Sequence, residues 1–179
     1  MNNLAAAYEA TGQPAKAGPL FVESAAAMRD QYGPGSLELA GELAWLGRNH
    51  LLQQKYTEAE VILRECLSIR EKTQPDEWRT FNAKSMLGGA LLGQKKYAEA
   101  EPLMLAGYEG MKQRETKIPP EGKVRLTEAL ERLVQLDEAL EKKDEAAKWR
   151  KELEARKEAP ERLKLDKPRH ETSPGTPGK

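Results

Sequence analysis

The sequence predicts an all-α fold, an α-solenoid of about four antiparallel helix pairs. The first observation is a pattern that recurs three times, with its anchor alanines Ala17, Ala59 and Ala100 lying 42 and then 41 residues apart. A fixed period of this size is typical of stacked helical units. The second observation is that each unit contains two amphipathic runs separated by a short polar break, as at Gln53-Gln54-Lys55. Breaks of this length make consecutive helices antiparallel.

The second helix of each unit carries a continuous apolar stripe. Between Lys55 and Lys72, apolar or small residues recur with the spacing i, i+3, i+4, i+7, i+8, which predicts an amphipathic helix. These residues are Ala59, Ile62, Leu63, Cys66 and Leu67. The same spacing recurs in the stripes that begin at Ala17 and Ala100, and the stripes that begin at Ala59 and Ala100 each follow another amphipathic run.

The first helices contain glycines that indicate close contacts between helices. Gly47 and Gly88 lie in mid-helix, where glycine costs about 1 kcal/mol relative to alanine. One position of the first helix is occupied in successive repeats by Ala5, Gly47 and Gly88. The equivalent small position of the second helix is occupied by the anchor alanines. We expect these two positions to contact each other within each pair. We also expect Ser36 and Asp76 to cap the first helices of the second and third units.

These motifs resemble the tetratricopeptide repeat, in which a leucine and a small residue precede an aromatic residue and an alanine begins the second helix. The motifs that carry the resemblance are Asn2-Asn3-Leu4-Ala5, Tyr56-Thr57-Glu58-Ala59-Glu60 and Tyr97-Ala98-Glu99-Ala100-Glu101-Pro102-Leu103. With the period, they are similar to the 42-residue, kinesin-light-chain-like subclass, over residues 1–115. The resemblance implies a right-handed α-solenoid whose first helices line a concave groove for extended peptides or partner helices.

The chain divides into three parts. Residues 1–115 contain three repeat-like helix pairs, the first of them truncated at its N-terminus, and residues 116–157 contain a divergent fourth pair. In that pair Asp137 replaces the usual aromatic residue and Arg150 the usual large apolar residue, as suits a terminal cap with a polar outer face. Residues 158–179 are rich in proline and predict a disordered tail. Because no capping residue precedes the first helix, we expect the chain to be the carboxy-terminal piece of a longer array.

The resemblance also implies where a partner binds. Carried over by register, the predicted groove positions are Asn2, Asn3, Ala6, Ala44, Trp45, Arg48, Asn82, Ser85, Met86 and Gly89. Trp45 and Met86 replace the second asparagine of the first unit and predict a more apolar groove. An exposed tryptophan beside an arginine is a common composition for a binding hot spot. The alternative is that Trp45 packs beneath the neighbouring repeat.

Composition excludes several functional classes. The 29 basic and 29 acidic residues leave no net charge, so the basic footprint of a nucleic-acid-binding protein is missing. The sequence has no run of about 18 apolar residues that could span a membrane, and its amino terminus does not read as a secretory signal. The single cysteine, Cys66, excludes an internal disulfide, and we expect a cytoplasmic protein.

No motif supports catalysis, a cofactor or a metal site. His50 occupies the packing position of Tyr8 and Leu91, and Cys66 aligns with small residues that we expect to be buried. No pair of histidines or cysteines has the spacing of metal ligands. Residues 88–95 lack the lysine directly after the last glycine, and the preceding strand, that a phosphate-binding loop requires. We therefore expect a chain that is not an enzyme.

The leading functional prediction is a non-catalytic scaffold that binds a protein or peptide in the groove. An alternative comes from residues 87–118 and 126–153, which resemble the carboxy-terminal repeat regions of bacterial serine/threonine protein kinases. The chain would then be a regulatory or targeting segment of a larger kinase, because the motifs of the catalytic domain are absent from it. Self-association through the exposed amino-terminal edge is a third possibility.

Overall fold

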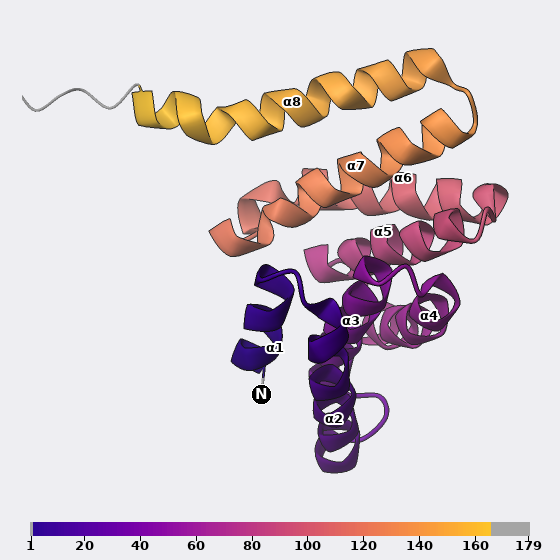
Figure 1. Cartoon of the computed structure of the whole chain (residues 1–179), viewed down its shortest axis with the longest axis vertical. Coiled ribbons are helices and arrows are strands. Elements are labelled where there is room, and N and C mark those ends of the chain that lie inside the picture. The colour runs from indigo at the N-terminus through magenta and orange to yellow at the C-terminus, as the bar shows by residue number, and fades with distance from the viewer. Residues whose placement is uncertain (1, 166–179) are drawn as a thin grey trace, which may run out of the picture.

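The computed structural model describes residues 2–165, and the side chains of residues 3–158 within them. This part of the chain forms eight α-helices and no strand. The four antiparallel pairs are α1 (Asn2–Ala10) with α2 (Pro14–Tyr32), α3 (Leu37–Leu52) with α4 (Tyr56–Thr73), α5 (Trp78–Gly93) with α6 (Tyr97–Gln113), and α7 (Val124–Ala139) with α8 (Lys143–Leu165). The first and last pairs lie at opposite ends of the stack (Figure 1). The predicted all-α solenoid is confirmed.

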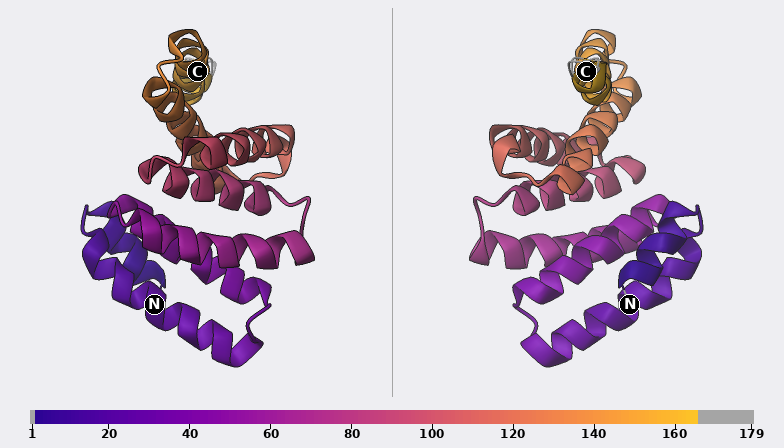
Figure 2. Two further views of the ribbon diagram at one scale, coloured as in Figure 1. Left: turned by 90° about the vertical axis from the view of Figure 1, so that its right-hand side faces the viewer. Right: turned by 90° about the vertical axis from the view of Figure 1, so that its left-hand side faces the viewer.

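Successive pairs are also rotated relative to one another. In the side views the last pair is seen nearly end-on, whereas the helices of earlier pairs lie across the view (Figure 2). None of the helices within residues 2–165 combines the length and the apolar composition that a bilayer span requires.

The turns inside the four pairs share one backbone conformation. Gly12, Gln54, Lys95 and Glu141 have positive φ angles of 72°, 58°, 62° and 59°. In every turn the amide of the next residue donates a hydrogen bond of 2.8–2.9 Å to the carbonyl oxygen five residues before it. This is the Schellman ending of a helix, which satisfies carbonyl groups of the last helical turn. The divergent fourth pair therefore has the same helix–turn–helix construction as the other three.

The two helices of a pair approach closely at the small residues. The anchor alanines have no exposed area. A Cβ atom at Gly47 would lie 2.5 Å from Cδ2 of Leu63, and one at Gly88 would lie 3.1 Å from the carbonyl oxygen of Ala100. Both distances are shorter than ordinary van der Waals contacts. The predicted contact is confirmed in the third pair, where Gly88 faces Ala100, whereas Gly47 of the second pair faces Leu63, one turn after the anchor Ala59. These close approaches explain why glycine is found in mid-helix at both positions.

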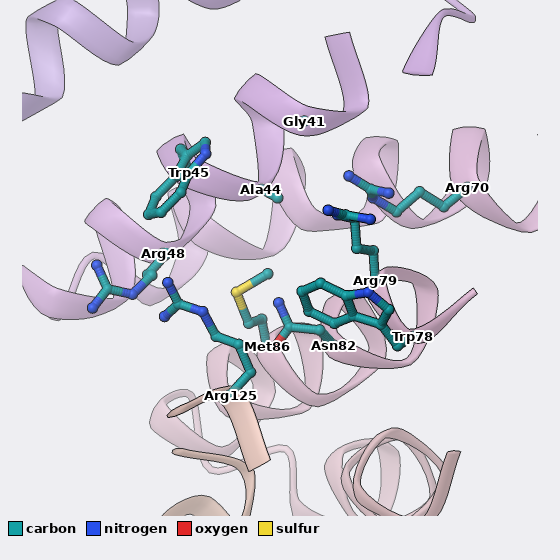
Figure 3. Close-up of a pocket in the computed structure, with 10 residues that line it drawn as sticks. All are labelled: Gly41, Ala44, Trp45, Arg48, Arg70, Trp78, Arg79, Asn82, Met86 and Arg125. Atoms are coloured by element: carbon teal, nitrogen blue, oxygen red, sulfur yellow. The ribbon is translucent and has the colours of Figure 1, made fainter. Parts of the chain in front are cut away.

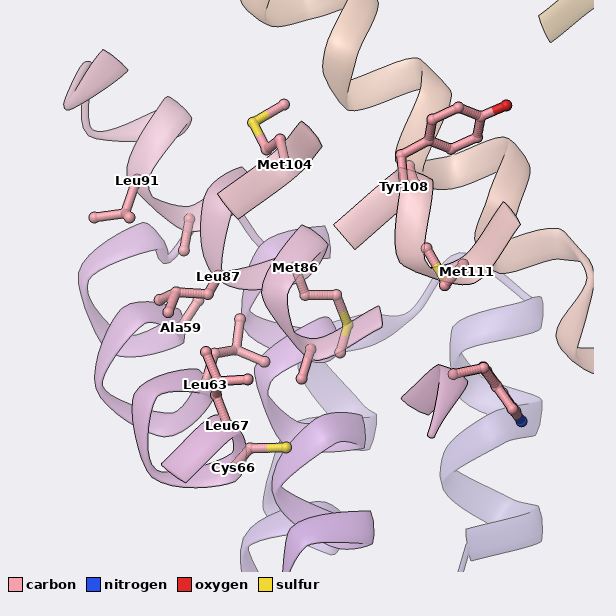
Figure 4. Close-up of a cluster of buried hydrophobic side chains, with 14 of the residues drawn as sticks. Ala59, Leu63, Cys66, Leu67, Met86, Leu87, Leu91, Met104, Tyr108 and Met111 are labelled. Carbon is pink, nitrogen blue, oxygen red and sulfur yellow. The ribbon is translucent and has the colours of Figure 1, made fainter. Parts of the chain in front are cut away.

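Apolar side chains of successive pairs form the core. Leu63 and Leu67 of α4 belong to the same buried cluster as Leu87 of α5 and Met104 of α6 (Figure 4). A smaller cluster joins Phe21 of α2 and its neighbours to α3. Because each cluster draws on consecutive pairs, every pair buries a side of the next one, as in other repeat solenoids.

One of the two predicted helix caps is present. The Oγ atom of Ser36 accepts a hydrogen bond of 3.3 Å from the amide of Leu39, so this cap of α3 is confirmed. The prediction for Asp76 is wrong, because α5 begins at Trp78 and its N-cap is Glu77, whose side chain makes no capping hydrogen bond. Asp76 lies one residue too early, and its carboxylate accepts a 3.4 Å hydrogen bond from Arg114 instead.

The fourth pair follows two short 3₁₀ helices, Glu115–Lys117 and Pro120–Gly122. Asp137 is buried and accepts a 3.0 Å hydrogen bond from the indole Nε1 of Trp149, which satisfies a carboxylate at the position that Tyr8, His50 and Leu91 hold in the other pairs. Helix α8 continues to Leu165, so the predicted end of the helical part at residue 157 is too early. The rest of the predicted tail, residues 166–179, lies outside the described residues.

Candidate partner-binding groove

A hollow of about 130 Å³ lies between α3, α5 and the start of α7. We call it the arginine-rich hollow. Its lining residues are Gly41, Ala44, Trp45, Arg48, Arg70, Trp78, Arg79, Asn82, Met86 and Arg125. Most of them belong to the first helices of the second and third pairs, on which the sequence places the groove. Figure 3 shows Met86 lying between the two tryptophans.

The floor of the arginine-rich hollow is apolar. Met86 is 1% exposed and Trp78 is 8% exposed, and both belong to the main core cluster. Trp45 is 38% exposed, and its ring stacks almost parallel to that of Phe21, with the ring centroids 6.3 Å apart. Trp45 is therefore partly packed and partly exposed, and its role as a binding hot spot stays a prediction. Part of its surface packs on the preceding pair, and part faces the hollow.

Four guanidinium groups surround this floor. The Arg79 guanidinium lies 4.6 Å from the ring centroid of Trp78, and that of Arg125 lies 5.4 Å from the ring centroid of Trp45. Such cation–π contacts orient the arginines. Among the described residues that line the hollow, none is acidic. A concave surface lined by charges of one sign concentrates its electrostatic field and attracts groups of the opposite sign.

Two buried polar atoms in the lining have no hydrogen-bond partner. They are Nε of Arg70, a residue that is 5% exposed, and Oδ1 of Asn82, a residue that is 9% exposed. A buried polar atom without a partner costs about 1–3 kcal/mol.

The structure brings half of the predicted groove positions together. Ala44, Trp45, Arg48, Asn82 and Met86 all line the arginine-rich hollow. These five come from the second and third repeats, and their role in binding a partner stays a prediction.

The other predicted positions do not line the hollow. Asn3 and Ala6 are exposed on α1, and the side chain of Asn2 is outside the described part of the chain. Ser85 has no exposed area and accepts a 3.1 Å hydrogen bond from Nη1 of Arg132. The same arginine covers Gly89, where a Cβ atom would lie 2.9 Å from its Cδ. The long side chain of Arg132 therefore closes the α5 surface that the sequence predicts to be open.

Sequence reasoning missed several residues of the hollow. Arg79 stands three residues before Asn82, a predicted groove position, whereas Arg125 lies in the fourth pair, where the sequence predicted no groove position. Residues three apart share a helix face, so this signal was available for Arg79. Arg70 comes from α4, a second helix, and its presence depends on how the second and third pairs stack.

A chain of charged residues runs beside the hollow. Arg48 of α3 forms ion pairs with Glu9 of α1 and, at 3.5 Å, with Glu128 of α7. Glu128 also pairs with Arg125 at 2.7 Å. Burial opposes the ionisation of Glu128, but the guanidinium groups of Arg125, Arg132 and Arg48 outweigh it and lower the pKa of the carboxyl group. Glu128 is therefore a negative charge at the edge of the arginine-rich hollow.

The nucleophilic and titratable side chains singled out in the sequence are packed. Cys66 donates a 3.2 Å hydrogen bond to the carbonyl oxygen of Ala40, and burial raises the pKa of its thiol. Burial likewise lowers the pKa of His50. Within the described part of the chain, no group of three or more histidine, cysteine, aspartate or glutamate side chains could hold a metal ion.

Comparison with known proteins gives one family and a set of similar folds. Residues 1–72 match the family model of the tetratricopeptide repeat. BtubC (BKLC) from P. vanneervenii is 14% identical, with a TM-score of 0.68, and the match covers 98% of this chain and 68% of that one. A putative kinesin light chain from Podosopora anserina, with nearly identical TPR-like repeats, is 15% identical, with a TM-score of 0.55 and coverages of 89% and 94%. At these identities the likeness concerns the fold. No curated protein matches the chain significantly.

Proposed function

We propose that this chain, whose residues 1–72 are tetratricopeptide repeats within a kinesin light chain-like solenoid, is a scaffold whose protein partner binds in the arginine-rich hollow. The observation that carries the proposal is the composition of the hollow. An apolar floor of Trp45, Trp78 and Met86 lies beneath four arginines, on the face that α3 and α5 build. Tryptophan and arginine are the residues most enriched among binding hot spots.

The size of the hollow favours a side chain of a partner over a free small molecule. Pockets for small molecules usually enclose about 300–1,000 Å³, whereas this hollow encloses about 130 Å³. A peptide segment or a partner helix that lies along α3 and α5 can place one large apolar side chain on the floor of the hollow, over Met86. The rest of the segment then lies against the exposed parts of the first helices.

The charge of the lining selects the flanking residues of that segment. Arg79 and Arg125 stand over the aromatic rings, and acidic side chains are missing from the described lining. Complementary charges raise the rate of association and exclude basic competitors. We therefore infer that the preferred partner carries aspartate or glutamate residues next to its apolar anchor.

Selection of a random peptide library on the folded chain, followed by affinity measurements with the enriched peptides, tests this function. The enriched sequences should place acidic residues beside a large apolar one. Trp45→Ala should weaken their binding at least roughly tenfold, since hot-spot truncations commonly cost about 2 kcal/mol or more. Arg79→Ala should weaken binding without a large effect on folding, because Arg79 is exposed.

Val61→Ala is the matched control. Val61 is a 65% exposed apolar residue on α4 and does not line the hollow, so its removal should leave the affinity unchanged. If folded Trp45→Ala and Arg79→Ala proteins both keep the affinity of the wild type, the partner does not bind in the arginine-rich hollow. The kinase association and the self-association expected from the sequence stay predictions.

A further inference from the structure

We propose that Glu128 is a built-in competitor for the arginine-rich hollow, a carboxylate of the chain itself that an acidic partner has to displace. Glu128 forms ion pairs with Arg48 and Arg125, the two arginines at one end of the hollow. This inference rests on the proposed function, since it concerns how the partner's acidic group gains access to the same arginines.

The surroundings of Glu128 are those of a bound anion. Its two carboxylate oxygens accept hydrogen bonds of 2.7 and 2.9 Å from Nη1 of Arg125. Nη2 of Arg48 lies 3.5 Å away and Nη2 of Arg132 lies 3.6 Å away. Charge-assisted contacts between guanidinium and carboxylate groups are among the stronger polar interactions in proteins. Three guanidinium groups therefore converge on one carboxylate, as they would on the carboxylate of a ligand.

The contact between Arg48 and Glu128 joins pairs that are not neighbours. Arg48 belongs to the second pair and Glu128 to the fourth, so the ion pair passes over α5 of the third pair. Beside this ion pair, the missing side chain of Gly89 leaves room for Arg132, whose Cδ would lie 2.9 Å from a Cβ atom built there. A larger residue at position 89 would displace Arg132, which also approaches Glu128.

The same ion pair separates two parts of the concave face. Arg48 lines the arginine-rich hollow and also a second hollow of about 420 Å³, to which Glu128 contributes. A partner that extends along the first helices from one hollow into the other meets the Arg48–Glu128 contact between them. An acidic side chain of the partner can replace Glu128 there, whereas a neutral one would leave the arginines without their counter-charge. Glu128 thus sets the requirement for an acidic residue at this end of the groove.

Glu128→Gln tests this role, because it keeps the shape of the side chain and removes its charge. The probe is a fluorescein-labelled peptide with one leucine between runs of glutamate, titrated with the chain at low ionic strength and followed by anisotropy. We expect the Glu128→Gln protein to bind it roughly tenfold more tightly than the wild type. The gain in affinity should shrink as salt is added, because salt screens the attraction between the arginines of the hollow and the glutamates of the peptide.

Two further variants provide the controls. Glu138→Gln removes the same charge from α7 at an exposed position that pairs with Arg150, and it should change the affinity less than twofold. Glu128→Asp keeps the charge and should bind the probe about as well as the wild type. Thermal melts establish that each variant is folded, and Glu128→Ala must show the same gain if the glutamine variant does not fold.

Each outcome decides between the two proposals. Equal affinities of the wild type and Glu128→Gln, with binding that still depends on Trp45, would overturn the role of Glu128 and leave the proposed function standing. An equal gain in Glu138→Gln would also overturn it, since the effect would then be one of net charge. Failure of both proteins to bind the probe would overturn the proposed function and this inference together.

Discussion

Replacing Gly107 by alanine should destabilise the chain, although alanine is the better helix former. Gly107 lies in α6, where it packs against the backbone of α5. A Cβ atom at this position would lie 2.6 Å from the amide nitrogen of Ser85 and 2.8 Å from the carbonyl oxygen of Phe81. Both are main-chain atoms in the middle of a helix. They cannot rotate away as the end of a flexible side chain would, so the two helices have to separate.

The magnitude follows from two opposing effects. Overpacking of a well-packed interior costs about 1–3 kcal/mol, and a rigid neighbour places Gly107 near the upper end. The change from glycine to alanine in a helix returns about 1 kcal/mol. The expected net loss is about 2 kcal/mol in the free energy of unfolding. For a chain of this size that loss lowers the melting temperature by roughly 4–8 °C.

Gly41→Ala provides a matched comparison. Gly41 also lies inside a helix, α3, but a Cβ atom there meets nothing within 4 Å. The same propensity gain applies without the clash, so this variant should be stabilised by up to about 1 kcal/mol. Urea denaturation followed by far-ultraviolet circular dichroism measures both values. If the two variants shift in the same direction, the reasoning from interhelical distance is refuted.

Three further predictions concern a helix cap, a turn and a titrating carboxylate. Ser36→Ala should lower the free energy of unfolding by about 1 kcal/mol, because it removes the cap of α3. Asp76→Ala should be nearly neutral in the same urea experiment, because Asp76 caps no helix. Glu141→Gly should stabilise the chain by about 1 kcal/mol, since φ is 59° there and glycine adopts positive φ without strain; an unchanged or lower melting temperature would contradict this. The hydrogen bond from Lys96 lowers the pKa of Glu60 to about 2, so the stability that this carboxylate contributes above about pH 4.5 should disappear as the pH falls from 4.5 towards 2. Glu60→Gln should flatten the fall of the melting temperature over that interval.

The repeat architecture could be derived from the sequence because it depends on local patterns. The apolar stripes, the polar breaks and the small residues at Gly47 and Gly88 report on contacts within one helix pair, between residues close together in the chain. The structure confirms those contacts. The failure at Asp76 is of a different kind. A cap requires the side chain to stand immediately before the first helical residue, and the sequence placed the start of α5 one residue too early.

The candidate site could be derived only in part. Register placed Trp45 and Met86 in the hollow correctly, because a position on a first helix keeps its direction from one repeat to the next. Repeat register does not predict that Arg132, from the divergent fourth pair, lies across Ser85 and Gly89. Long, flexible arginine side chains reach beyond their own repeat, and local spacing says nothing about where their ends lie.

The amino-acid sequence by itself determined the number of helix pairs and their antiparallel construction, since these follow from hydrophobic periodicity and turn chemistry within about forty residues. The tertiary structure alone decided how the pairs rotate against one another, and with that which charged side chains meet. The arginines of the hollow come from α3, α4, α5 and α7, and Glu128 reaches Arg48 across a whole intervening pair. Contacts over such separations depend on the superhelical stacking of all four pairs, which no single repeat encodes.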